Sequence, residues 1–159
     1  MRSLVIGYGN ASRRDDGVGL HLINGLRIRW GQEALADSAD GWDELGGGHD
    51  TLFLQQLSPE LAATLAEYER VIFVDAALPD LPEALRVEPV APSYRLGAIS
   101  HHLEPATLLA LTGQLYGRAP EAYLVSVRGH DFDFGDQLSA ATAAALSEAV
   151  ERVLALTAA

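Results

Sequence analysis

The chain has 159 residues, of which 48% are hydrophobic and 21% are charged, a balance typical of one globular domain with a packed core. Its net charge of −11 argues against nucleic acid and anionic membranes as partners, because both attract basic surfaces. The lack of cysteine excludes disulfides, thiolate metal ligands and a cysteine nucleophile. The sequence shows no apolar run of roughly 18 residues and no signal peptide, so we expect a cytoplasmic protein.

A strand and a helix joined by a glycine turn are predicted first. The short apolar run Leu4–Ile6 predicts a buried strand that ends in the turn Gly7–Asn10, where glycine and asparagine permit tight backbone angles. Apolar residues at helical spacing predict a helix from about 16 to 30, with Asp15 or Asp16 as its N-cap. Between 32 and 50 the pattern is unclear, and 34–39 reads as a short helix or a poor strand.

The rest of the chain alternates between helices and strands. The predicted elements are a helix opened by Ser58 and Pro59 and reaching about Tyr68, a central strand Val71–Val74 ending at Asp75, an edge strand Ala84–Val90, a helix Thr107–Tyr116 ended by Gly117, a buried strand Ala122–Val127, a loop Phe132–Leu138, and a last helix capped by Ser139 and reaching about Leu156.

This alternation predicts an α/β fold in which residues 1–159 form a single three-layer domain. A twisted, mainly parallel sheet carries helices on both faces. Ligands of such sheets bind beyond the carboxyl ends of the strands. We therefore expect the segment 7–16, Asp75 and the pair His101–His102 to meet at one edge of the sheet.

Three kinds of chemistry suit that edge. A nucleotide- or small-molecule-binding module would use the turn at Gly7–Asn10, although Gly7, Gly9 and Ser12 match only part of the G-x-G-x-x-G fingerprint and aspartates follow where a pyrophosphate would lie. A metal site would instead use Asp16, Asp75 and one histidine of the pair.

Two carboxylates and one imidazole suit nickel, zinc, iron or manganese and leave coordination positions open. In a third interpretation, Asp16 and Asp75 form a carboxylate dyad, with one pKa raised by repulsion between like charges. Ordinary structural roles, a helix cap for Asp16 and a turn acceptor for Asp75, fit the same residues, and residue spacing leaves the choice open.

Five segments, taken in order, match one known family. They are G-Y-G-N at 7–10, D-D-G-V-G at 15–19, V-I-F-V-D-A at 71–76, S-H-H-L-E-P-A-T-L-L-A-L at 100–111 and G-x-x-L-S at 135–139. On these motifs the chain resembles the hydrogenase maturation proteases, endopeptidases that remove the C-terminal extension from the precursor of the [NiFe] hydrogenase large subunit. The resemblance covers nearly the whole chain, and departs from the family's usual form between about Gly41 and Leu57.

The resemblance implies residue roles and a partner. Asp16, Asp75 and His101 correspond to the family's metal-contacting residues, with a one-residue ambiguity between His101 and His102. It further implies that Asp16 and Asp75 serve catalysis. From the residues themselves, we expect Gly7, Gly9, Asn10 and Asp15 to contact the substrate, because the glycines let the turn approach a partner's backbone closely. Nickel is expected to arrive already bound in the large-subunit precursor, and we expect the protease itself to be a monomer.

Overall fold

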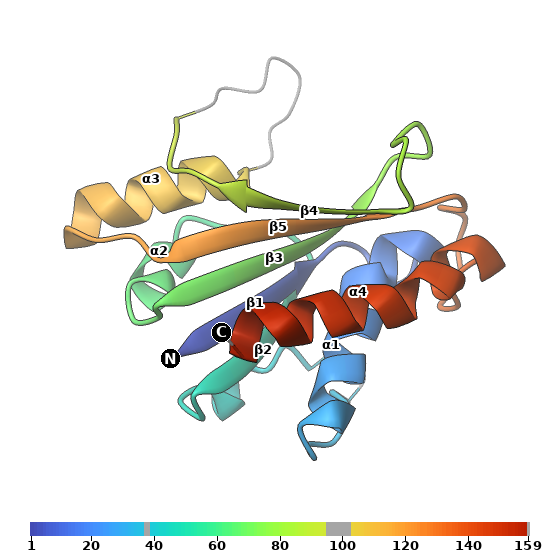
Figure 1. Cartoon of the computed structure of the whole chain (residues 1–159), viewed down its shortest axis with the longest axis horizontal. Helices are drawn as coiled ribbons and strands as arrows, with labels where there is room; N and C mark the ends of the chain where they lie inside the picture. The colour runs from blue at the N-terminus through green and yellow to red at the C-terminus, as the bar shows by residue number, and fades with distance from the viewer. Residues whose placement is uncertain (37–38, 95–102, 159) are drawn as a thin grey trace.

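The computed structural model describes residues 1–36, 39–94 and 103–158 (Figure 1). Its elements in chain order are β1 (Ser3–Tyr8), the 3-10 helix η1 (Arg14–Gly17), α1 (Val18–Arg29), the 3-10 helix η2 (Trp42–Glu44), β2 (His49–Leu54), α2 (Leu61–Leu65), β3 (Arg70–Ala77), β4 (Leu85–Val90), α3 (Pro105–Tyr116), β5 (Glu121–Arg128) and α4 (Ala140–Ala158). Within these ranges, no helix is both long and apolar enough to cross a membrane.

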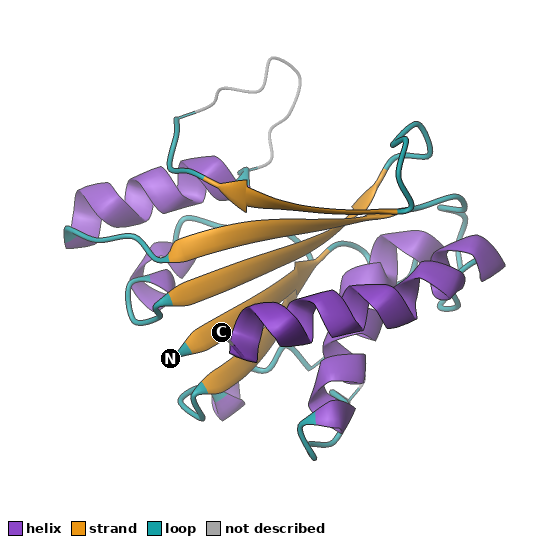
Figure 2. Ribbon diagram, in the orientation of Figure 1, coloured by secondary structure: helices purple, strands orange, loops and turns teal. Residues whose placement is uncertain are grey.

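The strands form one sheet in the order β2-β1-β3-β5-β4 (Figure 2). β1 runs parallel to β2 and β3, β3 runs parallel to β5, and β4 pairs antiparallel with β5 at the edge. The expected mainly parallel sheet is therefore confirmed. Pro89 lies within β4, and an edge strand tolerates a proline because one side of its backbone has no partner strand.

Helices cover both faces of the sheet, as expected, and make the fold three layers deep (Figure 1). One buried core joins the sheet to α2 and α3 through side chains that include Phe73, Leu61 and Leu108. The other joins it to α1 and α4 through side chains that include Val74, Leu22 and Val153.

The central strands contribute to both cores because successive side chains point to opposite faces. In β3, Val71 and Phe73 pack on the α2–α3 side, whereas Ile72 and Val74 pack on the α1–α4 side. The same two-residue period places Asp75 on the α2–α3 side, which is also the side against which Tyr8 of β1 packs.

The start of α1 differs from the prediction. The helix begins at Val18, after the 3-10 turn η1, and Gly17 occupies its N-cap position without a side-chain hydrogen bond. The expectation that Asp15 or Asp16 caps this helix is therefore wrong. Both carboxylates accept hydrogen bonds from other segments of the chain.

The boundaries of other helices and strands also differ from the predictions. α2 spans only Leu61–Leu65 and has Glu60 at its N-cap without a side-chain cap bond, so the predicted Ser58 cap and the longer helix are wrong. β3 continues beyond Asp75 to Ala77 because β5 goes on pairing with it. Residues 34–36 and 39 are neither helix nor strand. The Ser139 cap is supported by the backbone N–H of Thr142, which donates to Ser139 Oγ at 3.4 Å.

Candidate active site

The carboxyl ends of β1 and β3 lie side by side where the strand order reverses. From β1 the chain moves to β2 on one side and then to β3 on the other side of β1. Such a switch point is where ligands bind in open α/β sheets. The segment that follows β1 contains Asp16, and Asp75 lies near the end of β3.

Asp16 is held against the turn that follows β1. Its Oδ2 accepts a hydrogen bond of 2.6 Å from the backbone N–H of Asn10. Gly9 has φ +143°, and a Cβ at that position would lie 2.2 Å from the backbone oxygen of Asp16. Only glycine fits between the turn and Asp16, so Gly9 and Asn10 together fix where the half-buried Asp16 lies.

Gly7 lies deeper than the turn. A Cβ on Gly7 would lie 2.8 Å from the backbone of Gly19 in α1, so this glycine lets strand and helix pack closely. Gly7 is buried. Its position therefore explains the packing of β1 on α1, while Gly9 and Asn10 remain half-exposed at the edge of the sheet.

The backbone N–H groups of this turn are already in use. Gly9 donates to Leu54 O at 3.0 Å, Asn10 to the Asp16 carboxylate, and Ser12 to Asn10 Oδ1 at 2.9 Å. A phosphate loop needs such N–H groups to point at the ligand. The geometry thus disfavours the nucleotide-binding alternative, because the Asp16 carboxylate occupies the place of an anion.

Asp75 is half-buried and lies close enough to Asp16 for their charges to interact. Burial raises the pKa of Asp75 to about 7; the negative charge of Asp16 adds to the rise, and hydrogen bonds from the Ala76 backbone and from Tyr8 partly offset it. Burial, and then the neighbouring Asp75, raise the pKa of Tyr8 above its ordinary value. The Tyr8 hydroxyl therefore stays protonated and donates to the Asp75 carboxylate.

A cavity of about 560 Å³ adjoins Asp75 and Tyr8 on the α2–α3 side of the sheet. Its other lining residues come from the second half of β4 and the segment after it, from β5, and from the N-cap and first turn of α3. They are Glu88, Pro89, Val90, Ala91, Ser93, Glu104, Pro105, Ala106 and Leu124. The cavity offers room for part of a substrate next to the Asp75 carboxylate.

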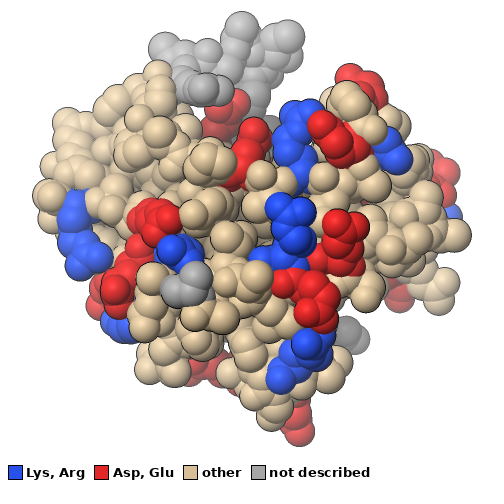
Figure 3. Space-filling view, in the orientation of Figure 1, with Lys and Arg blue, Asp and Glu red and all other residues tan. Residues whose placement is uncertain are grey.

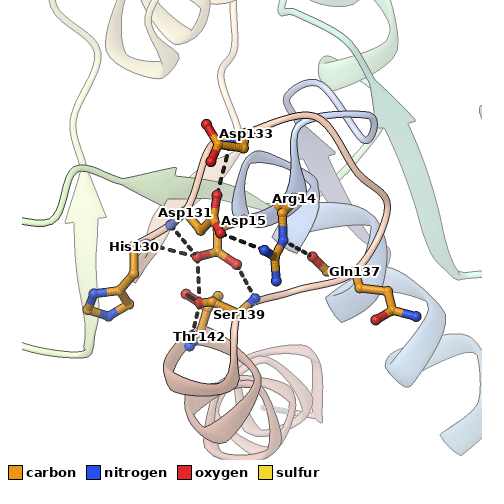
Figure 4. A network of polar contacts seen from close by, with 8 residues as sticks. All are labelled: Arg14, Asp15, His130, Asp131, Asp133, Gln137, Ser139 and Thr142. Carbon is orange, nitrogen blue, oxygen red and sulfur yellow. Dashed lines mark hydrogen bonds and ion pairs between the residues drawn. The ribbon is translucent and has the colours of Figure 1, made fainter.

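Asp15 lies beside this site without facing it. The residue is 0% exposed. Its Oδ2 accepts hydrogen bonds from the backbone N–H groups of His130 (2.8 Å) and Asp131 (2.9 Å) and from Ser139 Oγ (2.7 Å), and its Oδ1 accepts from the Ser139 N–H (2.7 Å) (Figure 4). The protein itself therefore engages this carboxylate, and Asp15 exposes no surface to the substrate that it was expected to contact.

These contacts also set the ionisation of Asp15. Burial by itself would raise the pKa of Asp15, but the hydrogen bonds from Ser139, His130 and Asp131 outweigh burial and hold the pKa well below its usual range. Asp15 is thus a charged anchor that ties η1 to the loop between β5 and α4.

Arg14 strengthens the same junction. Its Nη1 forms an ion pair with Asp131 Oδ2 at 2.5 Å, and its Nε donates to Gln137 O at 3.1 Å (Figure 4). On the backbone, Arg14 N–H donates to Gly135 O at 2.9 Å and Gly135 N–H donates to Ser12 O at 2.8 Å. The segments before and after Asp15 are therefore fastened to the 131–139 loop.

The predicted third metal ligand cannot be placed. His101 and His102 lie outside the described residues. Among residues 1–36, 39–94 and 103–158, no group of three or more His, Cys, Asp or Glu side chains is arranged to hold a metal ion. Asp16 and Asp75 are two interacting carboxylates, and a donor pair of this kind suits a divalent cation.

Two features of the site were missed in the sequence. Tyr8 follows Ile6 by two residues and so shares a strand face with the core, which predicts its orientation but not its hydrogen bond to Asp75. The segment Phe132–Leu138 was predicted only as a loop. Only the G-x-x-L-S pattern marked it, and that pattern does not reveal the buried partner Asp15.

No protein-family model matches the chain, and no curated protein matches it significantly. Among solved structures, the hydrogenase maturating endopeptidase HybD from E. coli is 23% identical over 98% of this chain and 91% of that protein, with a TM-score of 0.74. The [NiFe] hydrogenase maturation protease HybD from Thermococcus kodakarensis is 21% identical over 99% of both chains, with a TM-score of 0.64.

A third similar structure is the hydrogenase 2 maturation peptidase from Thaumarchaeota archaeon SCGC_AB-539-E09, which is 21% identical over 98% of this chain and 97% of that one, with a TM-score of 0.60. At these identities the likeness is one of fold. The chain therefore has, over nearly its whole length, the fold of the hydrogenase maturation proteases.

Proposed function

We propose that the protein is a cytoplasmic endopeptidase that removes the C-terminal extension of a [NiFe] hydrogenase large-subunit precursor after nickel insertion. The observation that carries the proposal is the pair of interacting carboxylates, Asp16 and Asp75, at the switch point of a fold shared with maturation endopeptidases. The proposal explains why the turn Gly9–Asn10 is built around a carboxylate rather than around an anion-binding site.

Asp75 is the better placed of the two carboxylates to move a proton. A group whose pKa is about 7 takes up and releases protons readily near neutral pH. In the proposed reaction Asp75 accepts a proton from the attacking water and returns it to the departing amine. The Tyr8 hydroxyl holds the Asp75 carboxylate in a fixed orientation at the end of β3.

Nickel belongs to the substrate in this proposal. Asp16, Asp75 and His101 would contact the ion that the precursor already holds. Such a cation would lower the pKa of Asp75 from its value of about 7 in the enzyme alone, so that Asp75 meets the attacking water in its ionised, proton-accepting form. Such an ion would supply Lewis-acid polarisation of the scissile carbonyl or of a water molecule. In the alternative version, nickel only positions the precursor and an aspartate alone activates the water.

The proposal is tested by incubating the enzyme with nickel-loaded precursor and measuring the precursor's C-terminus by mass spectrometry. Wild-type enzyme should shorten the precursor. Asp16→Asn and Asp75→Asn should each slow cleavage by about 10²-fold or more, the usual contribution of a positioned acid–base group. Precursor without nickel should stay uncut if the ion is what the enzyme recognises.

Asp43→Asn is the matched control because Asp43 is an exposed aspartate of η2 that does not line the cavity at Asp75, and its replacement should leave the rate unchanged. Separate His101→Ala and His102→Ala variants decide which histidine takes part. Normal cleavage by the Asp16 and Asp75 variants alike would overturn the site assignment.

A further inference from the structure

Phe134 is the most exposed large apolar side chain of the described residues. It is 90% exposed, at the loop between β5 and α4. Leu78, which is 68% exposed, directly follows the last residue of β3 at the same edge of the sheet. The start of the loop reaches this point, since Gly129 N–H donates to Ala77 O at 2.8 Å. Exposed apolar groups gathered at one edge typically mark a surface that meets another molecule.

The loop that carries Phe134 is held on both sides of it. Arg13 Nε donates to Phe132 O at 3.1 Å before Phe134, and Gly135 N–H donates to Ser12 O at 2.8 Å after it. Asp15 then fastens both ends of the loop, at 130–131 and at Ser139 (Figure 4). Phe134 is thus presented on a preorganised support, and such an anchor loses little conformational entropy on binding.

The same contacts place Phe134 relative to the catalytic carboxylates. Ser12 and Arg13 bond to the loop, and Asp16 follows in the same short segment, where its N–H donates to Arg13 O at 3.0 Å. A molecule that binds Phe134 is therefore held at a fixed distance from Asp16.

The charged residues beside Phe134 indicate what kind of partner surface would bind there. Asp133 and Asp136 lie on either side of Phe134 and are exposed, and neither takes part in an ion pair within the described part of the chain. Arg13, which is exposed and donates to Phe132 O, adds one positive charge beside these two aspartates, so the charge around Phe134 is net negative and complements an apolar pocket flanked by lysine or arginine. A second copy of this chain fits poorly, because it carries 22 acidic against 11 basic residues. Figure 3 shows the basic side chains of one face interspersed with acidic ones.

We propose that Phe134, together with Leu78, Asp133 and Asp136, forms a docking surface for the folded body of the precursor, on an apolar pocket flanked by basic residues. This docking surface rests on the proposed function. It would explain how the enzyme selects a folded protein rather than a free peptide. The precursor's body binds the Phe134 loop, and its C-terminal tail then extends to Asp16 and Asp75.

The test is steady-state kinetics on nickel-loaded precursor with Phe134→Ala. Removing a buried interface anchor should raise KM about tenfold or more, while kcat changes less than about twofold, because the reacting groups are untouched. Ile28→Ala is the matched control, since Ile28 is 65% exposed near the end of α1, and its KM should equal that of wild type. Thermal melts check that both variants stay folded.

The acidic neighbours are tested separately by association kinetics. The double variant Asp133→Asn with Asp136→Asn should bind the precursor more slowly than wild type and with a weaker dependence on salt, since rim charges act mainly on the association rate. An unchanged rate and an unchanged salt dependence would remove the charge complementarity from the proposal.

The possible failures are distinguishable. If wild-type enzyme leaves nickel-loaded precursor uncut, the proposed function fails. If wild type cuts it and Phe134→Ala has an unchanged KM, or loses kcat at unchanged KM, the docking surface alone is overturned. If wild type elutes as a dimer and Phe134→Ala as a monomer, the surface binds a second copy of the chain, and the docking proposal is likewise wrong.

Discussion

Asp15 and Asp16 are neighbours in the chain with separate tasks. The carboxylate of Asp15 is enclosed by four hydrogen bonds from the loop 130–139, whereas that of Asp16 is half-buried and bonded to the Asn10 N–H. Consecutive side chains of the 3-10 turn η1 leave the backbone in different directions. One carboxylate therefore fastens the site together while the next one can face a ligand.

At the residue scale, we expect Asp15→Asn to change how stability depends on pH. The folded state holds the pKa of Asp15 below the unfolded value of about 3.9. The stability that comes from the ionised group is therefore fully present above about pH 4 and is lost as pH falls through the folded value. At pH 7 the variant should lose about 1–3 kcal/mol of unfolding free energy, since an amide has only one acceptor oxygen for four donors.

Urea unfolding followed by circular dichroism at pH 7, 5 and 3 measures this effect. The difference in unfolding free energy between wild type and Asp15→Asn should be constant from pH 7 to 5 and become smaller towards pH 3. Asp43→Asn, in an exposed residue, should track wild type throughout. A gap of the same size at pH 3 would mean that the charge of Asp15 contributes nothing to the junction.

At the scale of elements, the turn between β1 and η1 is built for close approach. Gly9 N–H bonds to the end of β2 through Leu54 O, and the Cα of Gly9 faces the backbone of Asp16. The turn thus joins two strands and the segment that contains Asp16 within a few residues. A side chain at Gly9 has no room, because the atom that its Cβ would meet at 2.2 Å is the backbone oxygen of Asp16, which cannot rotate away.

We expect Gly9→Ala to cost both stability and activity. A Cβ would lie 2.2 Å from Asp16 O, and φ +143° is unfavourable for alanine. Backbone strain of this kind costs on the order of 1–3 kcal/mol, and displacement of Asp16 should lower the rate of precursor cleavage at least about tenfold. Denaturant unfolding and mass spectrometry of the cleaved precursor provide the two measurements.

Gly48→Ala distinguishes the cost of backbone strain from the cost of a steric clash. Gly48 also has a positive φ, +101°, but its added Cβ would meet nothing within 4 Å. This variant should show the conformational cost alone and keep full activity. Equal losses in the two variants would show that Asp16 does not depend on the close packing at Gly9.

At the scale of the whole molecule, one sheet lies between two cores and contributes side chains to both. The central strands β1 and β3 bury side chains on both faces, so neither core exists without them. Trp30 packs against the α1–α4 core, whereas Leu108 lies in the α2–α3 core and is 0% exposed. A destabilising substitution in one core should therefore also lower the stability of the other core.

We expect Leu108→Ala to lower the unfolding free energy by about 2–5 kcal/mol, the usual cost of a cavity at a buried leucine. In a Trp42→Phe background, the fluorescence of Trp30 and the far-UV circular dichroism should shift to the same lower urea midpoint, because both cores share the central strands β1 and β3. Leu115→Ala, in a residue 59% exposed on the same helix, should stay within about 0.5 kcal/mol of wild type. A fluorescence midpoint that remains at the wild-type value would show that the two faces unfold independently.

Much of the fold was predictable because it depends on local pattern. The apolar run Leu4–Ile6 indicated a buried strand and Val71–Val74 a central one, and leucine spacing located α3 to within two residues of its observed start at Pro105. α2 was overestimated because Ser58 and Pro59 resemble a helix start, yet the chain forms only a turn there before Leu61.

The sequence alone indicated the α/β class, the two-sided central strands, and Asp16 and Asp75 as the carboxylates of one sheet edge. These follow from side-chain period and from the rule that parallel strands end at the same edge. Only the tertiary structure decided that Asp15 anchors a loop more than a hundred residues away and that Tyr8 holds Asp75. It also decided that Phe134 is presented to solvent beside them. Hydrogen bonds between distant segments leave no periodic trace in the chain, so only the folded backbone brings such partners together.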